Sequence, residues 1–163
     1  MIKKNFKYYL SYLLTILIIF TLDRFTKLYI INESEKFGDI NIPISNFLSL
    51  ILIWNKGIAF GLFSFDSSLI YNLITSLIIL INLIIIYLVI TSDLLRSFFY
   101  VIIFGGSLGN LFDRLYYSAV PDFIDFHYNG FHWFIFNVAD IFISLGIICL
   151  ILIEFKEYIF VKK

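Results

Sequence analysis

The chain has 163 residues, of which 61% are apolar, 20% are aromatic and only 15% are charged. A soluble domain has about 45–50% apolar and about 25% charged residues, so the composition indicates a membrane protein, with residues 1–163 forming one domain. Twelve basic and twelve acidic residues cancel without a basic run, which excludes nucleic acid as a partner, and the single cysteine, Cys149, excludes an internal disulfide.

The first apolar segment is the uncharged run Tyr8–Leu22, which continues in a helical pattern to Ile31. Lysines precede it, as in a signal peptide, but no small-x-small cleavage site follows, so we expect a retained membrane span over residues 8–31. Within this span Asp23 and Lys27 lie four positions apart with the acid first, which predicts an ion pair on one helix face.

A short apolar run follows the first span and predicts β structure. Phe47–Trp54 is rich in Leu and Ile, and Pro43, Ser45 and Gly57 bound it. We expect a strand or hairpin in a β segment over about residues 41–63. Because an open strand edge is not tolerated in hydrocarbon, this segment should lie at the membrane interface against the helices.

Three further apolar runs predict membrane spans over residues 69–90, 98–117 and 134–153. The expected fold is therefore an all-α membrane protein with four transmembrane helices and a small extracytoplasmic β-sheet segment. Lys and Arg residues are enriched on the cytoplasmic side of membrane proteins. Most of the Lys and Arg residues here lie at the same side of the predicted spans as the two termini, so we expect both termini in the cytoplasm. The outer connection 118–133 is expected to be a loop that carries His127 and His132.

Polar residues gather toward the outer ends of the spans. Asn110, Asp113 and Arg114 share one face of the third span at i+3 and i+4 spacing, and both a structural and a functional role stay open for them. Gly105 and Gly109 form a GxxxG pattern that permits close approach of helices. We expect that approach to bring Asn110 and Arg114 within reach of the fourth span.

The fourth span contains Asn137 and Asp140 on one face, with Asp140 expected about 9 Å below the start of the helix. An intramembrane carboxylate without a cation within four positions indicates function. Two carboxyl groups that share a proton can activate water, and the segment before the span offers Asp122 and Asp125 as the second member. Spacing alone does not choose between them. HExxH, CxxC and phosphate-loop motifs are absent, so we expect no metal and no cofactor.

Two other classes of protein fit these residues. A small ion or solute carrier also places carboxylates inside a helix bundle, but it needs them through the whole depth of the bilayer. A purely structural membrane subunit would tolerate amides at both aspartate positions.

Five motifs in order discriminate among these classes. They are Asp23-Arg24-Phe25-Thr26-Lys27, Asn55-Lys56-Gly57-Ile58-Ala59-Phe60-Gly61, Gly105-Gly106-Ser107-Leu108-Gly109-Asn110-Leu111-Phe112-Asp113-Arg114, Val120-Pro121-Asp122-Phe123 and Phe136-Asn137-Val138-Ala139-Asp140. Together they resemble the lipoprotein signal peptidases, signal peptidase II of bacteria.

The resemblance implies a membrane aspartic endopeptidase that removes the signal peptide from diacylglyceryl-modified prolipoproteins, cutting before the lipidated cysteine. It selects Asp122 and Asp140 as the catalytic pair. It associates Asn55, Gly57, Asn110, Arg114 and Asn137 with the active site or substrate, and Asp23 and Lys27 with support of the fold. We further expect a monomer in the bacterial cytoplasmic membrane, in contact with lipid, with the site near the outer face, where the polar residues of the spans gather.

Three positions depart from the family pattern. Phe134 follows Trp133 where proline is common, Arg24 stands where an amide is frequent, and Ile58 replaces a small residue. These departures affect the start of the fourth span, the charge balance near Asp23 and the width of the cleft, and none of them is a member of the aspartate pair.

Overall fold

The computed structural model describes residues 5–57 and 68–161. Ile58 and the end of the predicted β segment lie outside the described residues. Four helices and four strands follow one another in the described ranges. In chain order they are α1 (Phe6–Phe37), β1 (Asn41–Ser45), β2 (Leu48–Asn55), α2 (Ser68–Thr91), α3 (Leu94–Tyr117), β3 (Val120–Tyr128), β4 (Phe131–Phe136) and α4 (Val138–Val161).

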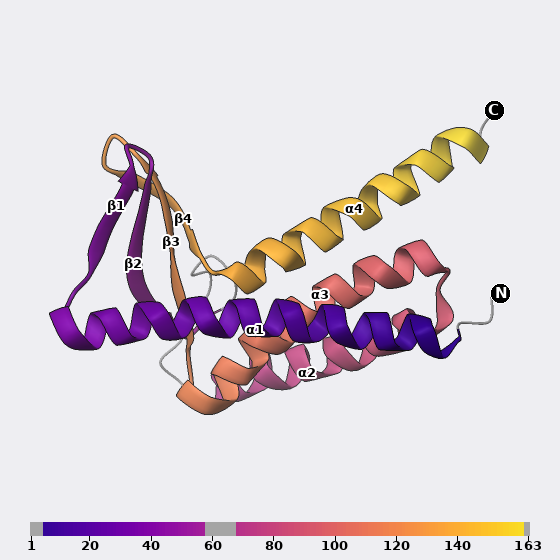
Figure 1. Cartoon of the computed structure of the whole chain (residues 1–163), viewed down its shortest axis with the longest axis horizontal. Helices are drawn as coiled ribbons and strands as arrows, with labels where there is room; N and C mark the ends of the chain where they lie inside the picture. Colours follow the sequence, from indigo (N-terminus) through magenta and orange to yellow (C-terminus); the bar gives the residue numbers. More distant parts are fainter. Residues whose placement is uncertain (1–4, 58–67, 162–163) are drawn as a thin grey trace.

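Three helical stretches are long and apolar enough to cross a membrane: Leu69–Thr91, Leu94–Tyr117 and Val138–Phe160. They correspond to the second, third and fourth predicted spans, so a mostly helical membrane fold is confirmed. Helix α3 is central and packs against α1, α2 and α4 (Figure 1). The start of α1 and the end of α4 lie at one end of the molecule, and the sheet lies at the other.

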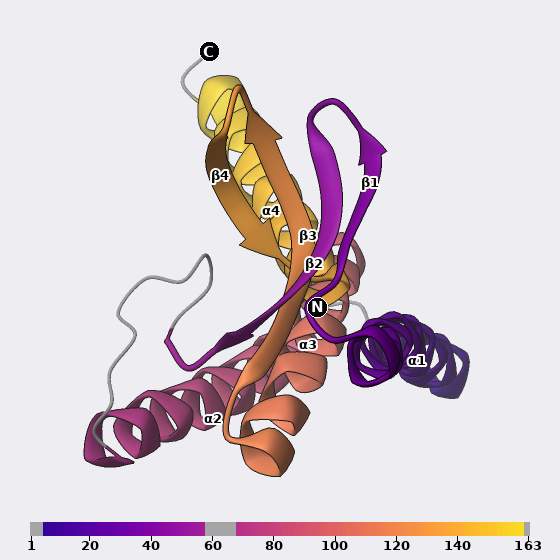
Figure 2. The same cartoon turned by 90° about the vertical axis from the view of Figure 1, so that its left-hand side faces the viewer.

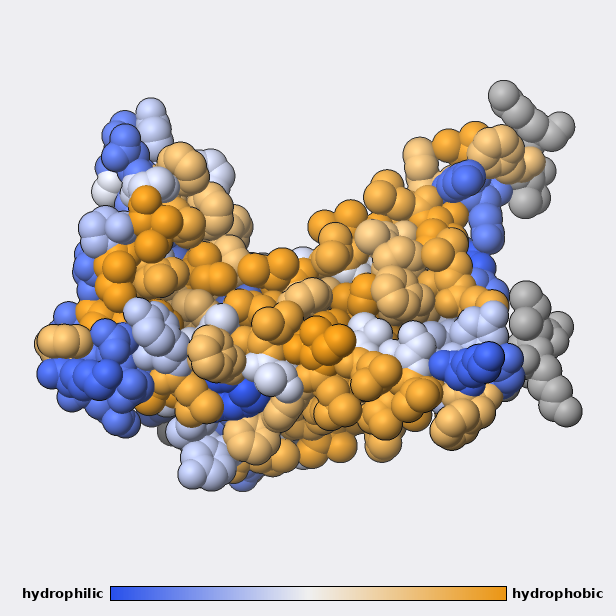
Figure 3. All heavy atoms as spheres, viewed as in Figure 1, coloured by the Kyte–Doolittle hydropathy of each residue, from blue (hydrophilic) through white to orange (hydrophobic). Residues whose placement is uncertain are grey.

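An apolar surface covers the helices between two polar ends (Figure 3). Many large side chains on it are open, among them Leu73 and Leu83 of α2 and Ile151 of α4. Apolar surface on this scale is stable against lipid rather than water. The surface is hollowed between the sheet and α4, which diverge from each other (Figures 1 and 3).

The expectation of a loop between the third and fourth spans was wrong. Residues of this connection form β3 and β4, an antiparallel hairpin that turns at Asn129 and Gly130, whose φ angles are +47° and +79°. An Asn-Gly pair with positive φ at both positions favours a two-residue hairpin turn. His127 and His132 are consequently cross-strand partners in the sheet, not loop residues.

The fourth helix begins at Val138 rather than at residue 134. Phe134 and Phe136 belong to β4, because their backbones pair with Phe126 and Ile124 of β3. Asn137 follows the strand and caps the helix. Asp140 therefore lies in the first turn of α4, not about two turns inside it as expected.

The sheet is antiparallel, with strand order β1-β2-β3-β4 (Figure 2). The predicted β segment supplies β1 and β2, and the hairpin supplies the other half. Irregular register in β2 between Leu50 and Ile53 brings Ile53 opposite Asp122 and Asn55 opposite Val120. The end of β2 is thereby paired with the start of β3, which follows the C-terminal end of α3.

Glycines of α3 allow close packing on both sides. A Cβ atom at Gly105 would lie 3.1 Å from Ile19 of α1, and one at Gly109 would lie 2.5 Å from an oxygen of Asp23. Gly106 faces the other way, where a Cβ would lie 2.6 Å from the carbonyl oxygen of Ala139 in α4. The Gly105 and Gly109 pair therefore lets α1 approach, and the approach of α4 depends on Gly106.

Candidate active site

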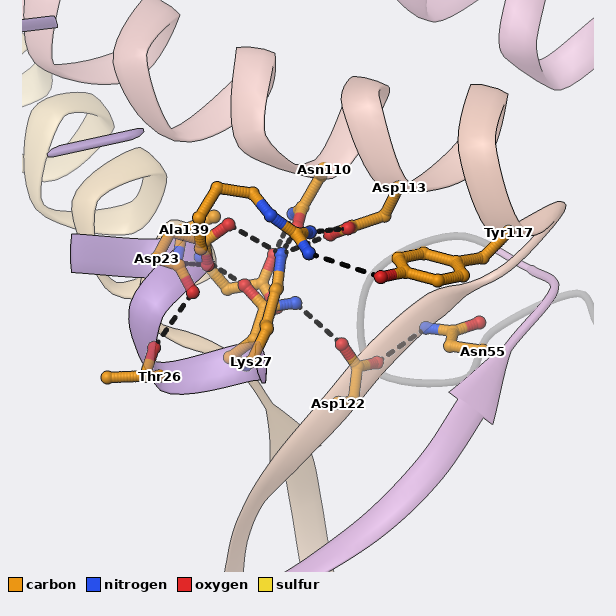
Figure 4. Close-up of polar contacts among 12 residues, drawn as sticks. Asp23, Thr26, Lys27, Asn55, Asn110, Asp113, Tyr117, Asp122 and Ala139 are labelled. Atoms are coloured by element: carbon orange, nitrogen blue, oxygen red, sulfur yellow. Dashed lines mark hydrogen bonds and ion pairs between the residues drawn. The ribbon is translucent and has the colours of Figure 1, made fainter. Parts of the chain in front are cut away.

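Asp122 lies near the start of β3 and is almost completely buried, with 2% of its surface exposed. Asn55, the last residue of β2, donates from Nδ2 to Asp122 Oδ2 at 2.8 Å. Asn137 donates from Nδ2 to Asp122 Oδ1 at 2.6 Å. Two amides thus hold both oxygens of this carboxyl group (Figure 4).

Asp140 is positioned by a capping box at the start of α4. Asn137 Oδ1 accepts a hydrogen bond from the Asp140 N–H at 3.1 Å, and Asp140 Oδ2 accepts from the Asn137 N–H at 3.2 Å. This reciprocal pattern satisfies two helix N–H groups and places the carboxylate at the positive end of the helix dipole. Asn110 of α3 holds the other oxygen, donating from Nδ2 to Asp140 Oδ1 at 2.8 Å.

The two aspartates share one cavity of about 290 Å³. Asn137 bonds to both of them, so they are linked by a single side chain. Burial, and next the negative charge of Asp140, raise the pKa of Asp122 to about 7. A carboxyl pair in which one member keeps its proton near neutral pH has both an acid and a base available.

Asp125 is not part of this arrangement. It is 1% exposed, does not line the cavity, and contacts His132 and His127 instead. Because Asp122 and Asp125 are three positions apart on one strand, their side chains point to opposite faces of the sheet. The structure therefore brings Asp122, and not Asp125, together with Asp140.

The predicted ion pair between Asp23 and Lys27 is confirmed, at 2.7 Å, and both side chains are fully buried. Lys27 Nζ also donates to Asp113 Oδ2 and to Asn110 Oδ1, each at 2.7 Å. Asn110 in turn binds Asp140, so Lys27 orients the amide that holds this carboxylate (Figure 4).

Asp23 also contacts α4 directly. Its Oδ1 accepts the backbone N–H of Ala139 at 3.0 Å, which is one of the N–H groups that a helix start leaves without a partner inside the helix. Helix α1 thus holds the first turn of α4, in which Asp140 lies.

The structure identifies the partner of Arg24. Its guanidinium group pairs with Asp113, lies 4.9 Å from the ring centre of Phe112, and lies 3.5 Å from the hydroxyl of Tyr117. Asp23, Lys27, Asp113 and Arg24 together carry no net charge, which lowers the cost of burying them.

Arg114 lines the cavity from α3. Its Nη2 donates to the carbonyl oxygen of Gly57, and the Gly57 N–H donates to Asn55 Oδ1 at 2.8 Å. Its Nη1 is buried without a hydrogen-bond partner among the described residues. Among the described residues, Asn110 makes the expected contact with α4, whereas the hydrogen bond of the Arg114 side chain goes to the end of β2.

Sequence reasoning missed several residues at this site. Ser107 of α3 and Ser144 of α4 line the cavity, and Tyr71 of α2 donates its hydroxyl hydrogen to the carbonyl oxygen of Arg114 at 2.8 Å. A polar residue in an otherwise apolar span was the available signal for the two serines. The contact of Tyr71 depends on tertiary packing and has no local signal.

Comparisons with known proteins identify the family to which the chain belongs. The family model described as "Signal peptidase (SPase) II" matches residues 15–156. A lipoprotein signal peptidase of Pelagibacter ubique (strain HTCC1062) is 55% identical over 152 residues, which cover 93% of this chain and 92% of the relative. One from Wigglesworthia glossinidia brevipalpis is 45% identical over 140 residues, covering 85% of this chain and 90% of the relative.

A solved structure described as a bacterial membrane enzyme superposes with a TM-score of 0.77 at 29% identity, covering 91% of this chain and 89% of the other. A second structure with the same description has a TM-score of 0.71 at 30% identity, covering 88% of this chain and 92% of the other. The chain therefore belongs to the signal peptidase II family of aspartic peptidases, which are multi-pass enzymes of bacterial membranes.

Proposed function

We propose that this lipoprotein signal peptidase cuts diacylglyceryl-modified prolipoproteins just before the lipidated cysteine, with Asp122 and Asp140 as its catalytic pair. The observation that carries the proposal is the meeting of two buried carboxyl groups from β3 and α4 in one cavity, linked by Asn137. The pKa of Asp122 near 7 supports it, since an acid and a base are then present together at neutral pH.

The chemistry needs one water molecule and no net proton. The ionised member of the pair takes a proton from water, whose oxygen attacks the scissile carbonyl carbon, while the protonated member donates to the carbonyl oxygen. The resulting diol collapses, the C–N bond breaks, and the pair returns a proton to the leaving amine. The two carboxyl groups titrate together, so the acid and base roles belong to the pair.

Neighbouring donors would orient the peptide. The unpartnered Nη1 of Arg114 is suited to a backbone carbonyl of the substrate, because a fixed guanidinium donor binds carbonyl oxygen well. Asn55 and Asn110 would keep the carboxyl groups in place, with Gly57 and Lys27 holding Asn55 and Asn110 in turn.

A lipid-linked substrate suits the shape of the site. The first cavity has an apolar wall made by Ile78, Ile143 and Ile147. A second cavity of about 350 Å³ shares Asp140 and Ser144 with the first and is otherwise apolar. Acyl chains lying in these apolar parts would leave the scissile bond beside the aspartates, and the acylated cysteine would then be a binding requirement.

The proposed topology has four spans. Helix α1 would cross the membrane with the other three, its buried charges paired inside the bundle, and residues 1–163 would form one domain that acts as a monomer. Both termini would be cytoplasmic, since the start of α1 and the end of α4 lie at the end of the molecule opposite the sheet. A carrier would need paths to both faces, whereas the buried carboxylates of the described residues gather near the sheet end.

Cleavage of a diacylglyceryl-modified precursor by purified protein in detergent tests the proposal. Asp122→Asn and Asp140→Asn should each lower kcat/KM by about 10²–10⁴-fold, the usual contribution of acid–base catalysis. Asp39→Asn makes the same chemical change at an exposed position and should cleave at the normal rate. The same precursor without its lipid should not be cut. A normal rate in either of the first two variants would refute the assignment.

A further inference from the structure

Three side chains with metal-ligating atoms gather on the β3–β4 hairpin, on the face of the sheet opposite Asp122. Asp125 and His127 belong to β3, and His132 belongs to β4. Their ligand atoms all lie within 4.8 Å of one another. The proposed catalytic chemistry uses none of them, so the cluster needs a separate explanation.

The charge of Asp125 has little compensation in the sheet. This side chain is 1% exposed, and a buried carboxylate needs a cation, a metal or several hydrogen bonds. The four strands contain no Lys or Arg residue. The charged or polar groups recorded against the carboxylate in the described residues are the two imidazoles.

The two imidazoles present the same kind of atom to this carboxylate. His132 Nδ1 lies 2.8 and 2.9 Å from the two oxygens of Asp125. His127 Nδ1 lies 3.2 Å from Asp125 Oδ2, yet it is buried and makes no hydrogen bond within the described residues. Either a proton on Nδ1 or a cation bound between the two atoms makes such a close contact favourable.

Against the expectation from the sequence motifs that the chain holds no metal, we propose that Asp125, His127 and His132 bind one divalent transition-metal ion of the zinc type. Two imidazoles and one carboxylate are a common ligand set for Zn²⁺, with bonds of about 2.0–2.2 Å, and ligand atoms within 4.8 Å of one another can surround one such ion. The side chain of His132 is 57% exposed, so water can fill the fourth position. The ion would fasten β4 to β3 and thereby stabilise the hairpin that connects Asp122 with α4.

The sequence makes this site easy to test. The chain contains only two histidines, and both are in the cluster, while its one cysteine, Cys149, belongs to α4. The full chain, with any affinity tag removed and treated with a chelator, is titrated in detergent with Co²⁺ while visible absorption is recorded. Zn²⁺ is then added in competition, and the Tm is measured with and without Zn²⁺.

We expect one ion per chain, displacement of Co²⁺ by Zn²⁺, and a higher Tm with Zn²⁺, because a ligand that binds only the folded state stabilises it. His127→Gln and His132→Gln should each weaken Zn²⁺ binding by more than about tenfold, and Asp39→Asn should bind as the unaltered chain does. Because the side chain of His132 is exposed, His132→Gln should have the same Tm as the unaltered chain when no metal is present.

Two results would overturn the proposal, and neither depends on peptidase activity. One is the lack of saturable binding of Co²⁺ and Zn²⁺ by the unaltered chain. The other is unchanged affinity in the double variant His127→Gln/His132→Gln, which would place the ion elsewhere.

Discussion

Asn137 connects the two aspartates, and replacing it with serine separates its two contacts. Its Nδ2 donates to Asp122 at 2.6 Å, while its Oδ1 accepts the N–H of Asp140 at 3.1 Å. Serine keeps an oxygen that can cap α4. Its short side chain has no amide group to donate to Asp122, so Asn137→Ser removes one contact and preserves the other.

The size of the effect follows from the bond that is lost. A hydrogen bond to a charged group contributes about 1.5–3 kcal/mol. If the transition state loses this amount, kcat/KM falls by about 10- to 150-fold, at about 1.36 kcal/mol per tenfold. Asn137→Ala loses the cap as well, so its free energy of unfolding should be lower than that of Asn137→Ser by about 1 kcal/mol.

The pH dependence gives a second measurement. Burial and the charge of Asp140 raise the pKa of Asp122 to about 7, and the hydrogen bond from Asn137 opposes this rise. Without that bond the pKa rises further, so the pair keeps its proton to a higher pH. The alkaline limb of the rate profile, expected near pH 7 in the unaltered enzyme, should therefore move to higher pH in Asn137→Ser.

The assay is kcat/KM for cleavage of the lipidated precursor across a range of pH values, with Tm recorded for each variant. Asp39→Asn serves as the control. A normal rate in Asn137→Ser, or an alkaline limb that moves to lower pH, would refute the role given to Asn137.

Three further predictions concern the support of the site, and each is measured as a free energy of unfolding with kcat/KM alongside. Lys27→Met leaves Asp23 without its ion-pair partner in a fully buried network and should cost about 3–5 kcal/mol; an unchanged stability would contradict the network. Gly109→Ala brings a Cβ to 2.5 Å from an oxygen of Asp23, so it should lower the free energy of unfolding by about 1–3 kcal/mol and reduce kcat/KM. Unchanged stability would show that α1 can move away from α3 without cost. Arg96→Ala, at the opposite end of α3, removes exposed ion pairs to Asp93, Glu154 and Glu157. It should lower the free energy of unfolding by less than about 1 kcal/mol and leave kcat/KM unchanged. A large loss of stability would mean that the packing of α4 depends on these ion pairs.

Hydropathy and motif order predicted most of the helical architecture and the members of the candidate site. Long apolar runs are unambiguous for α2, α3 and α4, since each is long enough to cross a bilayer. The ion pair of Asp23 and Lys27 was predictable because a helix places residues four apart on one face.

The β3–β4 hairpin could not be found from hydropathy. Phe134–Phe136 at the end of β4 is apolar, and only Asn137 separates it from the apolar start of α4, so strand and helix read as one apolar run. Hydropathy does not distinguish the two, although the Asn129-Gly130 turn signal and the Asn137 cap mark the true boundaries.

The choice between Asp122 and Asp125 could not be made from spacing either. It depends on which face of β3 turns toward α4, and that is set by tertiary packing, which brings Asp122 to Asn137. In the same way, Arg24 and Asp113 are 89 positions apart in the sequence and belong to different helices, so no local sequence pattern predicts their contact.

The capping box at Asn137 affects how the spacing of the two aspartates responds to changes in bilayer thickness. Asp122 and Asp140 are connected along the chain by the β3–β4 hairpin and through hydrogen bonds by the side-chain amide of Asn137. Asp140 lies in the first turn of α4. Thinner or thicker bilayers tilt long helices, and tilt displaces the far ends most. We expect the spacing of the two acids to stay constant while α4 leans, so that peptide hydrolysis is insensitive to the acyl-chain length of the host lipid.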